Sequence, residues 1–319
     1  MSILVVAESE NGKLKKNAAE VVSYAKAIAD QQNTSLSAVA INCNAPQELG
    51  YHGAEKILTT KLSIDFFDAA IHAEIVAQAA KQEEAKIIVL SSSANAKYMA
   101  GMLAAKLDAA YVSNVVSVPK FDNELSVKRT AFSNKAFSYT SLHSDVSILG
   151  LSTNAFGAIE NQVSSELVEF QPDLPEQTTI QTEVSQTTGK ASIADADVVV
   201  SGGRGLKGPE NWGMIEELAD VLGAATACSK PVSDMGWRPH SEHVGQTGKP
   251  VATNLYFAIG ISGAIQHLAG INASKIKVVI NTDPEAPFFK AADYGIVGDA
   301  FDVVPRLTEK LKALQAGAV

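Results

Sequence analysis

The feature that most constrains this chain is a series of short, wholly apolar runs, each followed by a longer amphipathic stretch. Residues 3–7 predict a buried strand, and residues 17–30 follow with apolar side chains at helical spacing. The same alternation predicts strands at 36–41, 87–90 and 111–118 and helices at 66–82 and 96–107. Strands without polar alternation indicate a parallel sheet that is covered on both faces. The βαβα rhythm therefore predicts a doubly wound α/β domain.

After about Lys120 the pattern changes. Strands are predicted at 127–131, 136–141 and 146–151 with no helix between them, which favours an antiparallel extension of the sheet. Residues 164–170 and 178–185 alternate apolar with polar, as half-buried strands do. Residues 185–190 are small and polar and suit a linker. We therefore predict two domains, 1–187 and 188–319, as the length of 319 residues also favours.

A second α/β unit is predicted after the linker. Its strands are expected at 197–200, 224–227, 254–259, 277–280 and 296–297. Helices are expected at 211–222 and 303–314, and a further helix follows the glycine-rich loop 260–264 and ends at Leu268. The predicted fold class is α/β with two doubly wound domains. The N-terminal domain is nucleotide-binding-like with added antiparallel strands, and the C-terminal domain holds a parallel sheet.

Charge and hydropathy exclude some classes of partner. A net charge of −9 argues against binding to nucleic acid, which requires a basic surface to displace counterions. No apolar run approaches the ~20 residues that span a bilayer, and the chain starts directly as a strand, so we expect a cytoplasmic protein. Cys43 and Cys228 have no partner at a metal-binding or redox spacing, so we expect buried, reduced side chains.

Glycine-rich and polar clusters follow the predicted strands of the second domain, where ligands bind in an open parallel sheet. The clusters are Ser-Gly-Gly-Arg-Gly at 201–205, Val-Gly-Gln-Thr-Gly-Lys at 244–249, Gly-Ile-Ser-Gly-Ala-Ile-Gln-His at 260–267, and Asn281 with Asp299. Glycine lets the backbone approach a ligand, and Arg204 offers a forked donor to phosphate. By themselves the clusters predict a dinucleotide-like ligand. These clusters also have structural alternatives: a glycine turn at 201–205, a buried helical histidine at His267, and turn chemistry at Asn281 and Asp299.

The sequence does not match several nucleotide-binding and catalytic motifs. Gly203 and Gly205 suit the first two glycines of G-x-G-x-x-G, but Gly208 is not expected to suit the third, either in position or as a helix start. The segment that ends in Gly248-Lys249 is not a phosphate-binding P-loop, because Pro250 takes the Ser/Thr position. We find no nucleophile with a neighbouring base. A ligand site without such a pair is typical of a carrier rather than an enzyme.

Five segments of the second domain resemble the alpha subunit of electron transfer flavoproteins. They are 199–205, 244–249, 255–270, 280–287 and 292–299, within a match that runs from Val198 to the C-terminus. The resemblance implies that the chain binds FAD and shuttles electrons through an anionic semiquinone. The donors would be flavin dehydrogenases, such as the acyl-CoA dehydrogenases of fatty acid beta-oxidation, and the acceptor a membrane quinone oxidoreductase. It also implies a heterodimer with a smaller beta subunit that carries AMP, and no insertion of this chain into the membrane.

The resemblance also implies a set of FAD-binding residues. They are Arg204, Ser229, Lys230, Val244, Gly245, Gln246, Thr247, Ser262, Gly263, Ala264, Ile265, Gln266, His267, Asn281, Asp299 and Ala300. In the family pattern Arg204 lies near the FAD diphosphate and the flavin, the Thr247 hydroxyl lies near flavin N5, and His267 faces flavin O2. Residues 262–266 would hold the phosphates, and Asn281, Asp299 and Ala300 would line the adenosine end. A donor at His267 would stabilise the negative charge of the reduced flavin.

One residue departs from the family pattern. Relatives usually have Ser-Arg where this chain has Ser229-Lys230. Lysine keeps the positive charge but loses the planar fork of arginine and its ability to stack on the flavin. We therefore predict a less stabilised semiquinone or a shifted midpoint potential in this protein.

Three alternatives remain open at the level of sequence. A nicotinamide-dependent dehydrogenase would need G-x-G-x-x-G and an acidic residue about 20 positions further on. A specialised relative that works in electron bifurcation or in an anaerobic reductive pathway would keep the same FAD motifs, and its partner would carry FAD in place of AMP. A flavin-bound interaction protein would show no redox turnover.

Overall fold

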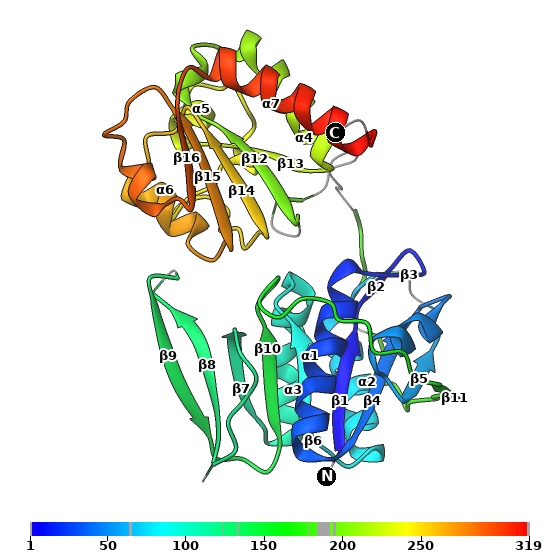
Figure 1. Ribbon diagram of the computed structural model, residues 1–319. Coiled ribbons are helices and arrows are strands. Elements are labelled where there is room, and N and C mark those ends of the chain that lie inside the picture. Colours follow the sequence, from blue (N-terminus) through cyan, green and yellow to red (C-terminus); the bar gives the residue numbers. More distant parts are fainter. Residues whose placement is uncertain are drawn as a thin grey trace. The chain divides into compact units, whose positions relative to one another are not determined.

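The computed structural model describes residues 2–63, 66–122, 124–132, 134–177, 179–183, 192–193 and 196–317. The chain divides into two compact units, Met1–Thr130 with Phe137–Ser185, and Gln186–Val319 with Ala131–Ala136. Each unit is built around its own sheet (Figure 1). The predicted boundary between 187 and 188 falls outside the described residues and stays a prediction.

The first unit is built on a nine-stranded sheet of order β11-β5-β4-β1-β6-β10-β7-β8-β9. Its strands are β1 (Ser2–Ala7), β4 (Ser35–Ile41), β5 (Lys56–Thr60), β6 (Ala85–Ser91), β7 (Ala110–Val115), β8 (Leu125–Ala131), β9 (Ala136–Leu142), β10 (Ser147–Leu151) and β11 (Glu166–Glu169). Every pairing from β11 to β7 is parallel, and β8 pairs antiparallel with β7. A small ribbon of β2 (Ser9–Glu10) and β3 (Lys13–Leu14) follows β1. The predicted doubly wound α/β fold is confirmed.

Helices cover both faces of this sheet. Ile3 and Val5 of β1 pack in the same core as α1 (Lys16–Gln32), whereas Leu4 and Val6 pack in the core of α2 (Ala69–Gln82) and α3 (Ala94–Leu107). Successive side chains of a strand point to opposite faces, so an unbroken apolar run is what a doubly covered strand requires. Capping residues set the helix starts. Asp68 accepts from the amides of Ala70 and Ile71, so α2 begins at residue 69 and not at 66.

The structure corrects three strand predictions. β10 is not part of the antiparallel extension, which consists of β8 and β9; it lies parallel between β6 and β7 with all five residues buried. β5 is missed by the prediction, because its sequence Lys-Ile-Leu-Thr-Thr carries little apolar pattern. Of the strand predicted at 178–185, residues 179–183 form no strand, and 178, 184 and 185 lie outside the described residues.

The second unit holds an all-parallel sheet of order β13-β12-β14-β15-β16. The strands are β12 (Val198–Gly202), β13 (Ala225–Cys228), β14 (Leu255–Ile259), β15 (Ile276–Asn281) and β16 (Tyr294–Val297). One face packs against α4 (Gly213–Leu222) and α7 (Ala300–Gln315), and the other against α6 (Ile265–Ile271), as Figure 1 shows. The predicted parallel C-terminal sheet is confirmed. Within the described ranges, no helix is long and apolar enough to cross a membrane.

Candidate functional site

The strand order of this parallel sheet reverses between β12 and β14, because the chain adds β13 on one side of β12 and β14 on the other. Ligands of doubly wound sheets bind outside the carboxyl ends of the strands at such a switch point. Here two glycine loops meet backbone to backbone. The Gly205 amide donates to the Gly260 carbonyl at 3.1 Å, and a Cβ on Gly203 would lie only 2.1 Å from that same oxygen. A side chain on Gly203 would separate the two loops, so glycine is required there.

Gly203, Gly205 and Gly208 do have the spacing G-x-G-x-x-G, so the expectation about the position of Gly208 is wrong. The expectation about the helix start is right. Two 3₁₀ turns, Arg204–Leu206 and Pro209–Asn211, separate the glycines from α4, which begins at Gly213. The next strand, β13, ends in Cys228, where the nicotinamide fingerprint places an acidic residue. The spacing is therefore present without the structural context of that fingerprint.

Two further segments are tied to this switch point by backbone hydrogen bonds. The Ser229 amide donates to the Gly202 carbonyl at 3.1 Å, and the Val244 amide donates to the Cys228 carbonyl at 3.0 Å. The Gln246 amide donates to the Gln266 carbonyl at 2.7 Å. Segments that are far apart in sequence thus lie together around the ends of β12, β13 and β14.

The structure brings all the sequence-predicted residues to the carboxyl edge of this one sheet. Eight of them present exposed side chains: Arg204, Lys230, Gln246, Thr247, Ser262, Ala264, Ile265 and Gln266. Six are buried, namely Ser229, Val244, Gly245, Gly263, His267 and Ala300, and Asn281 and Asp299 are half-buried. The side chain of Ile265 is 66% exposed, although it is apolar. The edge therefore offers cationic, amide, hydroxyl and apolar groups to a ligand.

Asn281 and Asp299 both use their side chains to shape loops. Asn281 Nδ2 donates to the Ile261 carbonyl at 3.0 Å, and its Oδ1 accepts from the Asp283 amide at 3.0 Å. Asp299 caps α7 by accepting from the Phe301 amide at 3.0 Å. The structural alternative therefore applies at both positions: Asn281 shapes a turn, and Asp299 caps a helix.

His267 is a buried, neutral imidazole. Its Nε2 lies 3.0 Å from the hydroxyl of Tyr256 on β14, and its Nδ1 has no hydrogen-bond partner among the residues that the structure describes. Burial lowers the pKa of His267 to about 4; the nearby His243 acts in the same direction, and the backbone of Val244 opposes it. A neutral imidazole can donate through one nitrogen only. The site thus contains a buried nitrogen with unused hydrogen-bonding capacity.

Tyr256 and Ser201 are the polar residues of this site that the sequence reasoning missed. Both have no exposed surface, and both belong to strands that otherwise read as apolar core. A tyrosine hydroxyl in the middle of a buried strand needs a partner, which is the signal that could have found Tyr256. Its partner, His267, is eleven positions away and becomes adjacent only in the fold.

In the part of the chain that the structure describes, this site contains neither a reactive thiol nor a cluster of metal ligands. Burial raises the pKa of the Cys228 thiol to about 12, and the charge of Glu242 adds to this effect, so the thiol stays protonated. Among the described residues, no group of three or more His, Cys, Asp or Glu side chains is placed to hold a metal ion.

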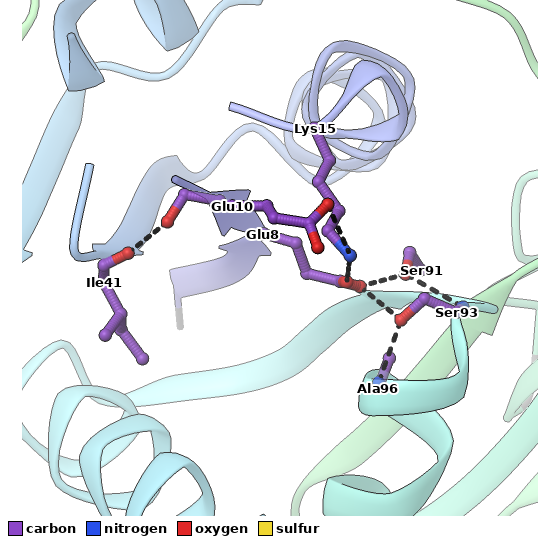
Figure 2. Close-up of polar contacts among 8 residues, drawn as sticks. Glu8, Glu10, Lys15, Ile41, Ser91, Ser93 and Ala96 are labelled. Atoms are coloured by element: carbon purple, nitrogen blue, oxygen red, sulfur yellow. Dashed lines mark hydrogen bonds and ion pairs between the residues drawn. The ribbon is translucent and has the colours of Figure 1, made fainter. Parts of the chain in front are cut away.

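At the corresponding edge of the first sheet a carboxylate of the chain itself lies at the switch point (Figure 2). Glu8, which follows β1, accepts hydrogen bonds from the hydroxyls of Ser91 and Ser93, the latter at 2.7 Å. Ser93 caps α3 by accepting from the Ala96 amide at 3.0 Å, and Lys15 Nζ lies 3.9 Å from Glu8. A helix start at a switch point is where an anion would bind. Because a carboxylate already occupies that position, the second unit is the candidate site.

Two family models match separate parts of the chain. Residues 3–184 match the family model described as "Electron transfer flavoprotein domain". Residues 192–272 match the one described as "Electron transfer flavoprotein FAD-binding domain".

Similar proteins span nearly the whole chain. The electron transfer flavoprotein subunit alpha of Bacillus subtilis is 34% identical over 317 residues, covering 98% of both chains. That of Paracoccus denitrificans is 37% identical over 319 residues, covering 98% of this chain and all of the relative. The mitochondrial subunit alpha of Arabidopsis thaliana is 33% identical over 327 residues, covering 98% and 90% of the two chains.

Proposed function

The chain belongs to the family of electron transfer flavoprotein alpha subunits, and we propose that it carries electrons from flavin dehydrogenases, such as acyl-CoA dehydrogenases, to a membrane quinone oxidoreductase. Its second unit is an FAD-binding domain. FAD supplies the redox chemistry, and the protein supplies binding, orientation and electrostatics. The proposal includes a heterodimer with an AMP-carrying beta subunit, a role in fatty acid beta-oxidation, a cytoplasmic location and transfer through the anionic semiquinone.

The observation that carries this proposal is the backbone surface formed by Gly203, Gly205 and Gly260. Cβ atoms at these positions would lie 2.1 to 2.8 Å from the opposing loop's backbone, so only glycine lets the two loops meet at the switch point. Backbone amides of such loops, together with cations, can offset the charge of a diphosphate without a large basic surface. Exposed Arg204 and Lys230 add the cations at the same edge. A net charge of −9 is compatible with a local anion site of this kind.

The family resemblance implies roles for the remaining residues, and their place at this edge is compatible with those roles. Gln246 and Thr247 are exposed on the loop that is bound to Gln266, which suits contacts along the edge of the flavin ring. Residues 262–266 follow β14 directly and would hold the phosphates. Asn281, Asp299 and Ala300, at the ends of β15 and β16, suit the adenosine end. Because the Asn281 amide is already bonded to the Ile261 carbonyl, part of its contribution is to hold the phosphate loop in shape.

The proposed role needs no chemistry on a metabolite. His267 is neutral and buried, so it can hydrogen-bond to a carbonyl of the flavin ring but does not act as a fixed cation in the ligand-free chain. The exposed apolar side chain of Ile265 would shield the ring from water. These residues would bind, orient and desolvate the cofactor, which is what an electron carrier requires.

The test is to co-express the chain with its beta subunit and to titrate the purified complex with dithionite without oxygen. We expect a yellow heterodimer with one FAD, which turns red on uptake of the first electron and exchanges electrons with an acyl-CoA dehydrogenase. A colourless complex, or a flavin reduced only in a single two-electron step, would contradict the proposal. The nucleotide extracted from the partner decides between AMP and a second FAD, which would indicate an electron-bifurcating relative.

A further inference from the structure

We propose that Tyr256 is a positioning residue for the cofactor site, because its hydroxyl donates to His267 Nε2 and thereby places the imidazole proton on Nδ1. This inference rests on the proposed function, since it concerns the nitrogen that the site offers to bound FAD. The two side chains come from different elements, Tyr256 from β14 and His267 from α6.

Each of the two paired groups has a defined protonation state. Burial raises the pKa of the Tyr256 phenol far above neutrality, so the phenol keeps its proton. Burial lowers the pKa of His267 to about 4, so the imidazole carries one proton and not two. The distance of 3.0 Å between Tyr256 Oη and His267 Nε2 is that of a hydrogen bond. One of the two groups must donate and the other accept.

The direction of this hydrogen bond follows from what each group can do with its proton. Tyr256 has no exposed surface, and among the described residues the hydrogen bond of its hydroxyl is the one to His267 Nε2. Ser201, on the same face of the sheet, has no hydrogen-bond partner there. If the imidazole donated through Nε2, the buried phenol proton would have no acceptor and Nδ1 would have no donor. The phenol therefore donates to Nε2.

A donor at Nε2 fixes the tautomer of the imidazole. When Nε2 accepts, the single proton of the neutral ring lies on Nδ1. Nδ1 has no partner at hydrogen-bonding geometry among the described residues, and the Val244 backbone, which raises the pKa of the ring, is the protein group that acts on it besides Tyr256 and His243. The ring itself is held by packing, because it lies between Tyr256 and Phe288 with centroid distances of 6.1 and 6.0 Å. The protein thus offers an oriented N–H donor from a buried, uncharged ring.

The test uses Tyr256→Phe, which removes the hydroxyl and keeps the ring in the core. Tyr24→Phe is the matched control: Tyr24 is also fully buried and donates to the Ser117 carbonyl at 3.0 Å, but it belongs to the first unit. Both variants are made as the full chain in complex with the beta subunit, labelled with ¹⁵N-histidine. The tautomer of His267 is read from the two ring nitrogen shifts, in FAD-free and in FAD-loaded complex.

In the native complex and in Tyr24→Phe we expect protonated Nδ1 and unprotonated Nε2. In Tyr256→Phe we expect averaged shifts from two tautomers, together with a more negative midpoint potential of the flavin. A native proton on Nε2, or an unchanged tautomer in Tyr256→Phe, would overturn the inference. Should Tyr256→Phe not fold, the tautomer of the native complex still decides it, because a proton on Nε2 would overturn the inference. Absence of FAD would instead refute the proposed function, because the tautomer is also read in the FAD-free complex.

Discussion

Gly203 and Gly260 meet so closely that a Cβ on Gly203 would lie 2.1 Å from the Gly260 carbonyl oxygen. The contact joins the loops after β12 and β14, and the Gly203 amide donates to the Ile259 carbonyl at 2.8 Å. The atom in the way is backbone, which cannot rotate aside as a flexible side chain can. The shape of the switch point in the second unit therefore depends on the absence of one methyl group.

Gly203→Ala should separate the two loops and weaken FAD binding by about tenfold or more, equivalent to about 1.4 kcal/mol. The measurement is FAD affinity by fluorescence titration of the apo complex. Gly213→Ala is the control, since a Cβ there meets no atom within 4 Å at the start of α4. Equal affinities in the two variants would show that the loop contact is not needed for binding.

Acid should destabilise the second unit through His267. The pKa of this imidazole is about 4 when folded and 6.5 when exposed, so the unfolded chain takes up the proton first as the pH falls. Stability is therefore full above the unfolded value and is lost toward the folded value, by up to about 1.4 kcal/mol per pH unit. His267→Gln should flatten this dependence in thermal unfolding of the FAD-free complex between about pH 7.5 and about pH 5. The exposed His143→Gln serves as control, and an equal slope in both variants would contradict the prediction.

Glu8→Ala should destabilise the first unit by about 2 kcal/mol, because two serine hydroxyls lose a charged acceptor. Glu10→Ala removes a carboxylate at the same distance, 3.9 Å, from the same Lys15, but from a side chain that is 57% exposed, against 12% for Glu8. Exposed ion pairs contribute little, so this control should cost about 0.5 kcal/mol or less. Thermal unfolding measures both. Similar losses would mean that Glu8 acts only through Lys15.

Lys230→Arg should increase the yield of the one-electron-reduced flavin and shift its midpoint potential to a more positive value. Lys230 is exposed directly after buried Ser229, at the end of β13, and arginine would add a planar fork that stacks on the ring. Anaerobic reductive titration measures both quantities. Lys97→Arg, at an exposed lysine of the first unit, is the control. Unchanged yield and potential in Lys230→Arg would refute a tuning role for this position.

Local sequence patterns predicted most strands and helices of both sheets, because alternation, apolar runs and capping residues act within a few positions. They missed the place of β10. Its sequence, Ser-Ile-Leu-Gly-Leu, follows β9 after a short loop with no helix between them, and it was assigned to the antiparallel strands that precede it in the chain. Pairing between β6 and β7 is a choice among distant partners, and no period in the sequence encodes it.

The sequence by itself determined the fold class and the two glycine loops, because strand ends and glycines are local features, whereas the set of site residues came from the family resemblance. Only the tertiary structure decided which switch point holds a carboxylate of the chain itself. In the first unit Glu8 lies there and accepts from Ser91 and Ser93, which lie more than eighty positions away. The fold likewise decided that His267 is uncharged and paired with Tyr256. Burial and hydrogen-bond partners set protonation, and both come from packing between segments that the sequence keeps apart.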